Sequence, residues 1–189
     1  MQLQRLSIRS IATLAIFTAI LFVTSTRAAA QEQVLHSFSN NGTDGIDPDG
    51  GAIFDAAGNL YGTTWAGGTY EGGTVYELTP AAGGGWTEKV LHSFNNNGTD
   101  AAYPAAGLIF DAAGNLYSTT AGGGAYRNGA VFELTPTAGG GWTEKVLYSF
   151  NGNGTGGDAP YSGLVFDAVG NLYGRPTMAV LTAAGQCSS

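Results

Sequence analysis

The sequence predicts an all-β fold in which tandem repeats of four short strands are arranged like the blades of a β-propeller. The stretch FDAAGNLYGTT at Phe54–Thr64 returns as FDAAGNLYSTT at Phe110–Thr120 and as FDAVGNLYG at Phe166–Gly174, with a period of 56 residues. A period of this length indicates a repeat architecture. The chain also holds 31 glycines among 189 residues, which fits many tight turns. After the first thirty residues, no stretch shows the 3.6-residue apolar period of a helix.

Residues 1–30 have the pattern of a secretory signal peptide. Arg5 and Arg9 precede the apolar run Ile11–Val23, and the small residues Ser25–Ala30 follow it. The apolar run has about thirteen residues, whereas a membrane-spanning helix needs roughly twenty. We therefore expect cleavage before Gln31, secretion to the periplasm or the cell exterior, and no membrane span in the mature chain.

The charge and the cysteine count of the mature chain exclude several classes of function. Removing the three arginines of residues 1–30 leaves four basic residues against 14 acidic ones, a formal net charge of −10. This balance argues against nucleic acid and against anionic membrane surfaces as partners. Cys187 is the single cysteine, so no internal disulfide can form, and the two histidines, His36 and His92, are too few for a Cys/His metal cluster. We expect no cofactor and no metal.

Each repeat predicts four strands separated by Gly, Asn and Pro. In the first repeat the predicted strands are Ala52–Phe54, Leu60–Thr64, Thr74–Thr79 and Trp86–Phe94. The segment DAAGN at Asp55–Asn59 is typical of a hairpin turn, because Gly and Asn accept positive φ and Asp bonds neighbouring N–H groups. Such a turn explains why Asp55, Asp111 and Asp167 recur. A ring of carboxylates around a ligand is the alternative.

The repeats divide the mature chain into residues 31–94, 95–150 and 151–174, called the first, second and third repeats, with a degenerate or truncated tail at 175–189. Val34–Phe38 has the sequence of a fourth strand and is expected to complete the last blade. Thr177–Gly185 faintly resembles a third strand.

Three blades are fewer than the usual four to eight, and open sheet edges invite pairing. A homodimer could close a six-bladed ring, the chain could stay an open arc, or it could be a fragment of a longer repeat protein. The loss of pattern at Arg175 favours the fragment.

The motifs VLHSF, GLIFDAAGNLYSTT and GAVFELTP carry a family resemblance. The sequence resembles the bacterial GloVer-type tandem repeat proteins, also called choice-of-anchor repeat proteins, over almost all of Val34–Gly174. FDAAGNLY is also similar to the core of NHL-type propeller blades. The resemblance implies an exported β-propeller-like protein, often fixed to the surface by a C-terminal sorting signal, and it implies no known activity. The segment LTAAGQCSS has no apolar span and no basic tail, so no anchor is expected.

No catalytic constellation emerges from the residues. His36 and His92 hold equivalent positions, and the third equivalent is Tyr148, which favours a packing role over the base of a triad. Nothing singles out a carboxylate pair of the kind that cleaves glycosides. Asn40–Gly50 has the composition of a calcium loop but not the spacing of the EF-hand.

The loops that vary between repeats are the best candidates for a binding surface. They are residues 39–50, 95–106 and 151–162, together with 66–73 and 121–129, and in a blade both loop types emerge on one face. Tyrosines beside carboxylates would suit a carbohydrate or another surface protein, and a solvated loop face is the alternative. The candidate ligand-binding residues are Asp44, Asp47, Asp49, Tyr70, Asp100, Tyr103, Tyr126, Arg127, Asp158 and Tyr161.

The sequence thus predicts an exported, non-enzymatic repeat protein with a binding or structural role at the cell exterior, on polysaccharide or protein. Two alternatives stay open. One is an extracellular polysaccharide hydrolase or lyase with carboxylates on the variable loop face, and the other is a truncated fragment of a longer repeat protein.

Overall fold

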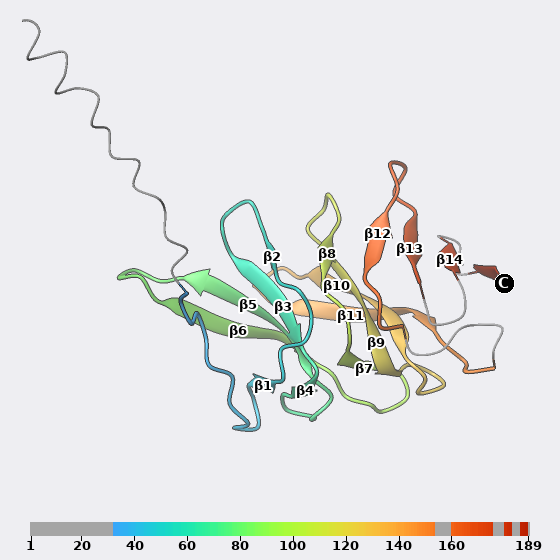
Figure 1. Cartoon of the computed structure of the whole chain (residues 1–189), viewed down its shortest axis with the longest axis horizontal. Coiled ribbons are helices and arrows are strands. Elements are labelled where there is room, and N and C mark those ends of the chain that lie inside the picture. Colours follow the sequence, from blue (N-terminus) through green and yellow to red (C-terminus); the bar gives the residue numbers. More distant parts are fainter. Residues whose placement is uncertain (1–31, 154–159, 176–179, 183–185, 189) are drawn as a thin grey trace, which may run out of the picture. The chain divides into compact units, whose positions relative to one another are not determined.

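The computed structural model describes residues 32–153, 160–175, 180–182 and 186–188 (Figure 1). The described repeats lie in one compact unit that begins at Val34. The predicted signal peptide lies outside the described residues. Within the described ranges every regular element is a strand, and no helix there could cross a membrane.

Three antiparallel sheets follow one another along the chain, and each has the strand order of a propeller blade. The first sheet contains β2 (Ile53–Phe54), β3 (Leu60–Thr64), β5 (Thr74–Pro80) and β6 (Trp86–Ser93). The second contains β7 (Ala101–Pro104), β8 (Ile109–Phe110), β9 (Leu116–Gly123), β10 (Ala130–Pro136) and β11 (Trp142–Ser149). The third contains β12 (Leu164–Phe166), β13 (Leu172–Gly174), β14 (Val180–Thr182) and β15 (Gln186–Ser188). A small ladder joins β1 (Gly45–Ile46) to β4 (Ala66–Gly67).

The predicted all-β fold is confirmed, and the strands of the first repeat lie within two residues of their predicted ends. The strand pairing of the first repeat recurs closely in the second. β5 and β6 lose register between Val75 and Tyr76, and β10 and β11 do so between Val131 and Phe132, 56 residues later. The same irregularity at the same place shows that the repeats share backbone detail as well as sequence.

The prediction that Val34–Phe38 forms the fourth strand of the last blade is wrong. These residues form no strand, and β15 occupies the fourth position of the third sheet. The fourth position is already filled, because β15 pairs with β14 at the edge of that sheet. The motif keeps its packing role instead, because the Phe38 ring meets Tyr76 edge-on at 4.9 Å.

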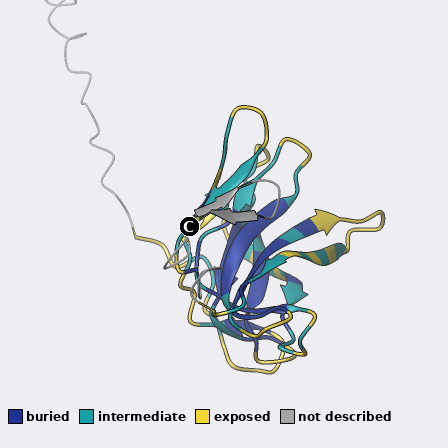
Figure 2. Ribbon diagram, turned by 90° about the vertical axis from the view of Figure 1, so that its right-hand side faces the viewer, coloured by how far each residue is buried: buried dark blue, intermediate teal, exposed yellow. Residues whose placement is uncertain are grey.

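The hydrophobic cores lie between successive repeats. The larger core combines Tyr61 and Phe94 of the first repeat with Leu108 and Phe132 of the second. A second core joins residues of the second and third repeats. Figure 2 shows the buried residues along the central strands and the exposed ones mainly at hairpin ends and loops. A repeat therefore buries its apolar side chains only against a neighbour.

Two aromatic contacts carry this packing from one repeat to the next. Phe110 meets Tyr61 of the preceding repeat edge-on at 5.1 Å, and Phe166 meets Tyr117 in the same way at 5.2 Å. The equivalent residue of the first repeat, Phe54, is 62% exposed.

One cross-strand pair differs between repeats in a compensating way. Gly62 on β3 lies opposite Tyr76 on β5, and a Cβ at position 62 would lie 2.3 Å from the Tyr76 hydroxyl oxygen. In the second repeat the same pair is Ser118 and Phe132. Phe132 has no hydroxyl, and the Ser118 hydroxyl bonds the carbonyl of Ala106 at 3.0 Å. In each repeat one hydroxyl, that of Tyr76 in the first and that of Ser118 in the second, therefore occupies the space between the paired residues.

Gly62→Ser alone is expected to lower the free energy of unfolding by about 1–3 kcal/mol, because the added atoms overpack the space held by Tyr76. Adding Tyr76→Phe is expected to restore most of the loss. Urea unfolding of the wild type, both single variants and the double variant gives the coupling energy. Phe132→Tyr with Ser118→Gly is the matched converse in the second repeat. If the losses in unfolding free energy simply add in both double-mutant cycles, the two side chains of each pair do not compete for one space.

Candidate functional site

The repeated aspartates belong to the hairpin turns, as the sequence predicts. Asp55 Oδ1 accepts hydrogen bonds from the N–H groups of Ala57 at 2.9 Å and Asn59 at 2.8 Å, and Oδ2 accepts one from the Asn59 amide. Gly58 supplies the positive φ, +88°. The same bonds recur around Asp111 and Asp167. These carboxylates therefore hold the turns.

A tyrosine extends each turn network. The Tyr117 hydroxyl lies 3.0 Å from Asp111 Oδ2 and 2.7 Å from Glu133 Oε1. Burial, Glu133 and Asp111 all raise the pKa of Tyr117, so the phenol stays protonated and can donate. Burial alone would raise the pKa of Asp111, but hydrogen bonds from Asn115, Tyr117 and Ala113 outweigh it and hold that pKa below its ordinary value.

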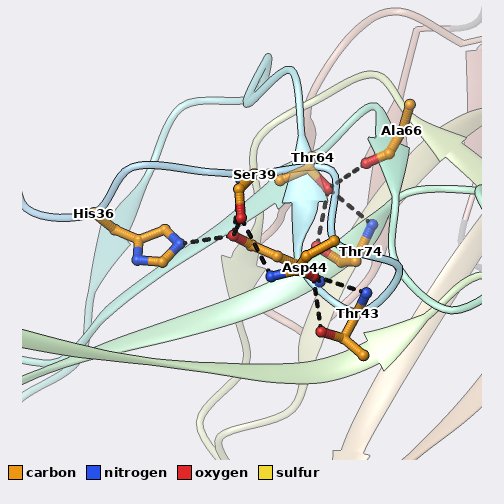
Figure 3. Close-up of polar contacts among 8 residues, drawn as sticks. His36, Ser39, Thr43, Asp44, Thr64, Ala66 and Thr74 are labelled. Carbon is orange, nitrogen blue, oxygen red and sulfur yellow. Dashed lines mark hydrogen bonds and ion pairs between the residues drawn. The ribbon is translucent and has the colours of Figure 1, made fainter.

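Two of the candidate carboxylates, Asp44 and Asp100, organise their own loops, and Figure 3 shows the contacts of Asp44. Asp44 Oδ2 accepts a hydrogen bond from the Ser39 N–H at 2.9 Å and lies 3.2 Å from His36 Nε2. Asp100 makes the equivalent contacts, at 2.7 Å to the Asn95 N–H and 3.2 Å to His92 Nε2.

Two of the candidate tyrosines meet on a tryptophan. Tyr103 of β7 stacks with Trp65 at 5.7 Å between ring centroids, and Tyr161 stacks with the same ring at 6.5 Å. The three rings come from three different repeats. Trp65 and Tyr103 are half-buried, whereas Tyr161 is 65% exposed. We call Trp65, Tyr103 and Tyr161 the aromatic stack.

The backbone beneath the aromatic stack is held in a rare conformation. Tyr103 and its equivalent Asp47 each precede a proline and have φ values of +60° and +55°. Positive φ is unfavourable for residues other than glycine. Hydrogen bonds hold both in place, since the Tyr103 N–H donates to Gly72 O at 2.7 Å and the Trp65 N–H donates to Asp47 O at 2.9 Å. This backbone conformation fixes the direction in which the Tyr103 side chain projects from the backbone.

The other described candidate residues add no ring to the aromatic stack, and Asp47 contacts it through its backbone carbonyl, which accepts the Trp65 N–H. Tyr70 and Tyr126 are 56% and 60% exposed, and among the described residues neither makes a ring contact with the stack. Asp47, Asp49 and Arg127 are exposed. Asp158 lies outside the described residues.

Sequence reasoning missed Trp65 and the two His–Asp pairs, although signals for both were present. The other two tryptophans, Trp86 and Trp142, begin the repeated segment WTEK, whereas Trp65 stands outside it and is replaced by Ala121 in the second repeat. Each histidine also precedes its aspartate by eight residues, as His36 precedes Asp44, in two consecutive repeats.

The match to a known family covers most of the chain. The family model of the Gloeobacter/Verrucomicrobia repeat matches residues 19–186. The chain belongs to the Gloeobacter/Verrucomicrobia repeat family. No curated protein matches it. The GloVer-type resemblance is thus confirmed, and the likeness to NHL blades stays a prediction.

In this Gloeobacter/Verrucomicrobia repeat protein, the aromatic stack is a surface on which a flat apolar group can pack. Tyr161 presents a solvent-exposed ring, and its phenol can donate or accept hydrogen bonds. The turn carboxylates lie in a separate part of each repeat, where their hydrogen bonds are used by the turn itself.

Asp111→Ala is expected to lower the free energy of unfolding at pH 7 by about 1–3 kcal/mol, because it removes hydrogen bonds to a charged acceptor. The folded-state pKa of Asp111 lies below its unfolded value of about 3.9. Its contribution is therefore present above that value and is lost as pH falls through the folded-state pKa. Urea unfolding from pH 7 to pH 2.5 should show the variant approaching the wild type. Ala112→Ser on the same exposed turn is the control, and a loss independent of pH would contradict the assignment.

Proposed function

We propose that this repeat protein is an exported, non-enzymatic binding protein that holds neutral polysaccharide at the cell exterior through the aromatic stack. The observation that carries the proposal is the meeting of Trp65, Tyr103 and Tyr161 from three repeats, with Tyr161 65% exposed. A fold alone does not give a function, whereas an exposed group of aromatic rings is a feature typical of a binding surface.

The chemistry of the aromatic stack suits a sugar ring. An aromatic face packs on the apolar C–H face of a sugar, while a phenol bonds the sugar hydroxyls. The formal net charge of the chain is −7. Negative charge disfavours approach of acidic polymers and therefore favours a neutral polysaccharide.

The role of the repeated carboxylates supports binding over hydrolysis. Asp55 and its equivalents accept hydrogen bonds within their turns, and Asp44 and Asp100 accept them within their loops. A glycosidase needs two carboxylates facing a scissile bond from opposite sides. The signal-peptide pattern of residues 1–30 supports export.

We also propose that two copies associate head to tail. In the contacts between repeats, a phenylalanine of one repeat packs on a tyrosine of the preceding one, as Phe110 packs on Tyr61. Phe54 is 62% exposed and lacks such a partner among the described residues. Tyr173 holds the tyrosine position of the third repeat. If Phe54 of each copy packs on Tyr173 of the other, the contacts are reciprocal and close a ring of six blades.

Tyr161→Ala is expected to weaken retention on neutral polysaccharide by about tenfold, because truncating an aromatic anchor at a binding surface commonly costs more than 1 kcal/mol. Affinity electrophoresis through gels that contain single polysaccharides measures the change. Tyr126→Ala is the matched control, since this tyrosine is equally exposed and lies outside the aromatic stack. Equal retention of Tyr161→Ala and the wild type on every polysaccharide that retards the wild type, or no retardation at all, would rule out the proposal.

Phe54→Ser is expected to convert a dimer to a monomer, because it removes the exposed ring that continues the packing between repeats. Light scattering coupled to size-exclusion chromatography gives the mass of each species. Val169→Ser is the control, since Val169 is 83% exposed on a hairpin turn. A monomeric wild type, or a variant that stays dimeric, would contradict head-to-tail association.

A further inference from the structure

A histidine and two carboxylates converge at a pocket beside the first sheet. His36 and Asp44 precede β1, and Glu88 lies on β6. One potential ligand atom from each of the three lies within 4.8 Å of the other two. The three residues line a pocket of about 580 Å³ together with hydroxyl and amide groups of the loop. Figure 3 shows the His36 ring directed at the Asp44 carboxylate.

The two carboxylates retain oxygens that nothing in the described chain satisfies. The Asp44 side chain is 8% exposed, and its hydrogen bonds all fall on Oδ2. Asp44 Oδ1 and Glu88 Oε1 are buried, and neither has a hydrogen-bond partner among the described residues. Lys89 also lines the pocket, but its ammonium donates to Gly140 O at 2.7 Å. Burying such acceptors unpaired is costly, so a cation or a proton has to compensate them.

We propose that His36, Asp44 and Glu88 bind one divalent transition-metal ion, for which zinc is the representative probe. One imidazole nitrogen and two carboxylate oxygens form a ligand set that zinc accepts. Two carboxylates and a neutral imidazole carry a charge of −2, which a divalent cation cancels. Calcium is a poorer match, because it takes six to eight oxygen ligands. Three protein ligands also leave a coordination position for water or for an oxygen from the pocket.

The second repeat carries the same residue types but differs at the decisive atoms. His92 Nε2 lies 3.2 Å from Asp100 Oδ1, and the Asn95 N–H bonds Oδ2, so both Asp100 oxygens are used. Glu144 Oε1 is buried without a hydrogen-bond partner in the described part of the chain, as Glu88 Oε1 is, so the two clusters differ at the aspartate and not at the glutamate. Among the described residues, the first cluster alone brings one potential ligand atom from each of its three residues within 4.8 Å of the other two. The structure therefore assigns one ion to the chain, at the first of the two clusters.

The pairing of the two clusters provides a matched experiment. The purified tag-free protein, carrying Cys187→Ser so that no thiol competes, is treated with EDTA and titrated with zinc chloride at pH 7.5 by isothermal calorimetry. We expect one zinc ion per chain with a dissociation constant below about 10 μM. Glu88→Gln is expected to weaken the affinity at least tenfold, and Glu144→Gln is expected to change it less than twofold.

A second variant keeps the test independent of folding defects. His36 lies outside the strands, so His36→Ala leaves every ladder of the first sheet in place. Zinc is expected to raise the melting temperature of the wild type, because a ligand bound to the folded state stabilises it, and to leave that of His36→Ala unchanged.

Three outcomes would overturn the proposal. The first is that the wild type shows no saturable binding up to 1 mM zinc, on the order of a thousandfold above a micromolar site. The second is that both Glu88→Gln and His36→Ala bind zinc as tightly as the wild type. The third is that Glu144→Gln loses as much zinc affinity as Glu88→Gln. In the first case a proton on Glu88 compensates the carboxylates, since burial and Asp44 raise the pKa of Glu88.

Discussion

Packing between successive repeats is the interaction on which the rest of this structure depends. A four-stranded sheet of this size cannot enclose its own apolar side chains, and each core is completed by residues of the next repeat. Phe94 illustrates the coupling. Its N–H bonds Gly73 O within its own sheet at 2.9 Å, while its ring meets Phe132 of the next sheet at 5.0 Å. The residues of the aromatic stack, which come from three repeats, meet because these contacts fix the spacing of the sheets.

The local elements could be predicted from the sequence because their causes are local. The hairpin turn at Asp55 depends on the residues up to Asn59, and β3 spans Leu60–Thr64 as predicted. The prediction for Val34–Phe38 was wrong because pairing is not a property of the motif alone. The sequence VLHSF contributes to a strand where it pairs with β5, and the same motif at Val34–Phe38 forms no strand.

The aromatic stack and the cluster at Asp44 could not be predicted in the same way. Trp65 and Tyr161 are 96 residues apart, and their rings meet because successive repeats pack against one another. The cluster at Asp44 depends on which oxygens of the aspartate carboxylate accept hydrogen bonds from its own loop. Asp44 and Asp100 look identical in sequence context, yet one leaves an oxygen without a partner and the other does not. Such differences of one atom are set by packing.

The two ways of filling the space between β3 and β5 have a consequence for the history of the gene. Gly62 belongs with Tyr76, and Ser118 belongs with Phe132. Recombination between repeated coding segments, with a breakpoint between positions 62 and 76, would join serine to tyrosine in one product and glycine to phenylalanine in the other. The first product overpacks the sheet and the second leaves a void. A crossover that preserves this packing is therefore expected to fall outside residues 62–76 and their equivalents.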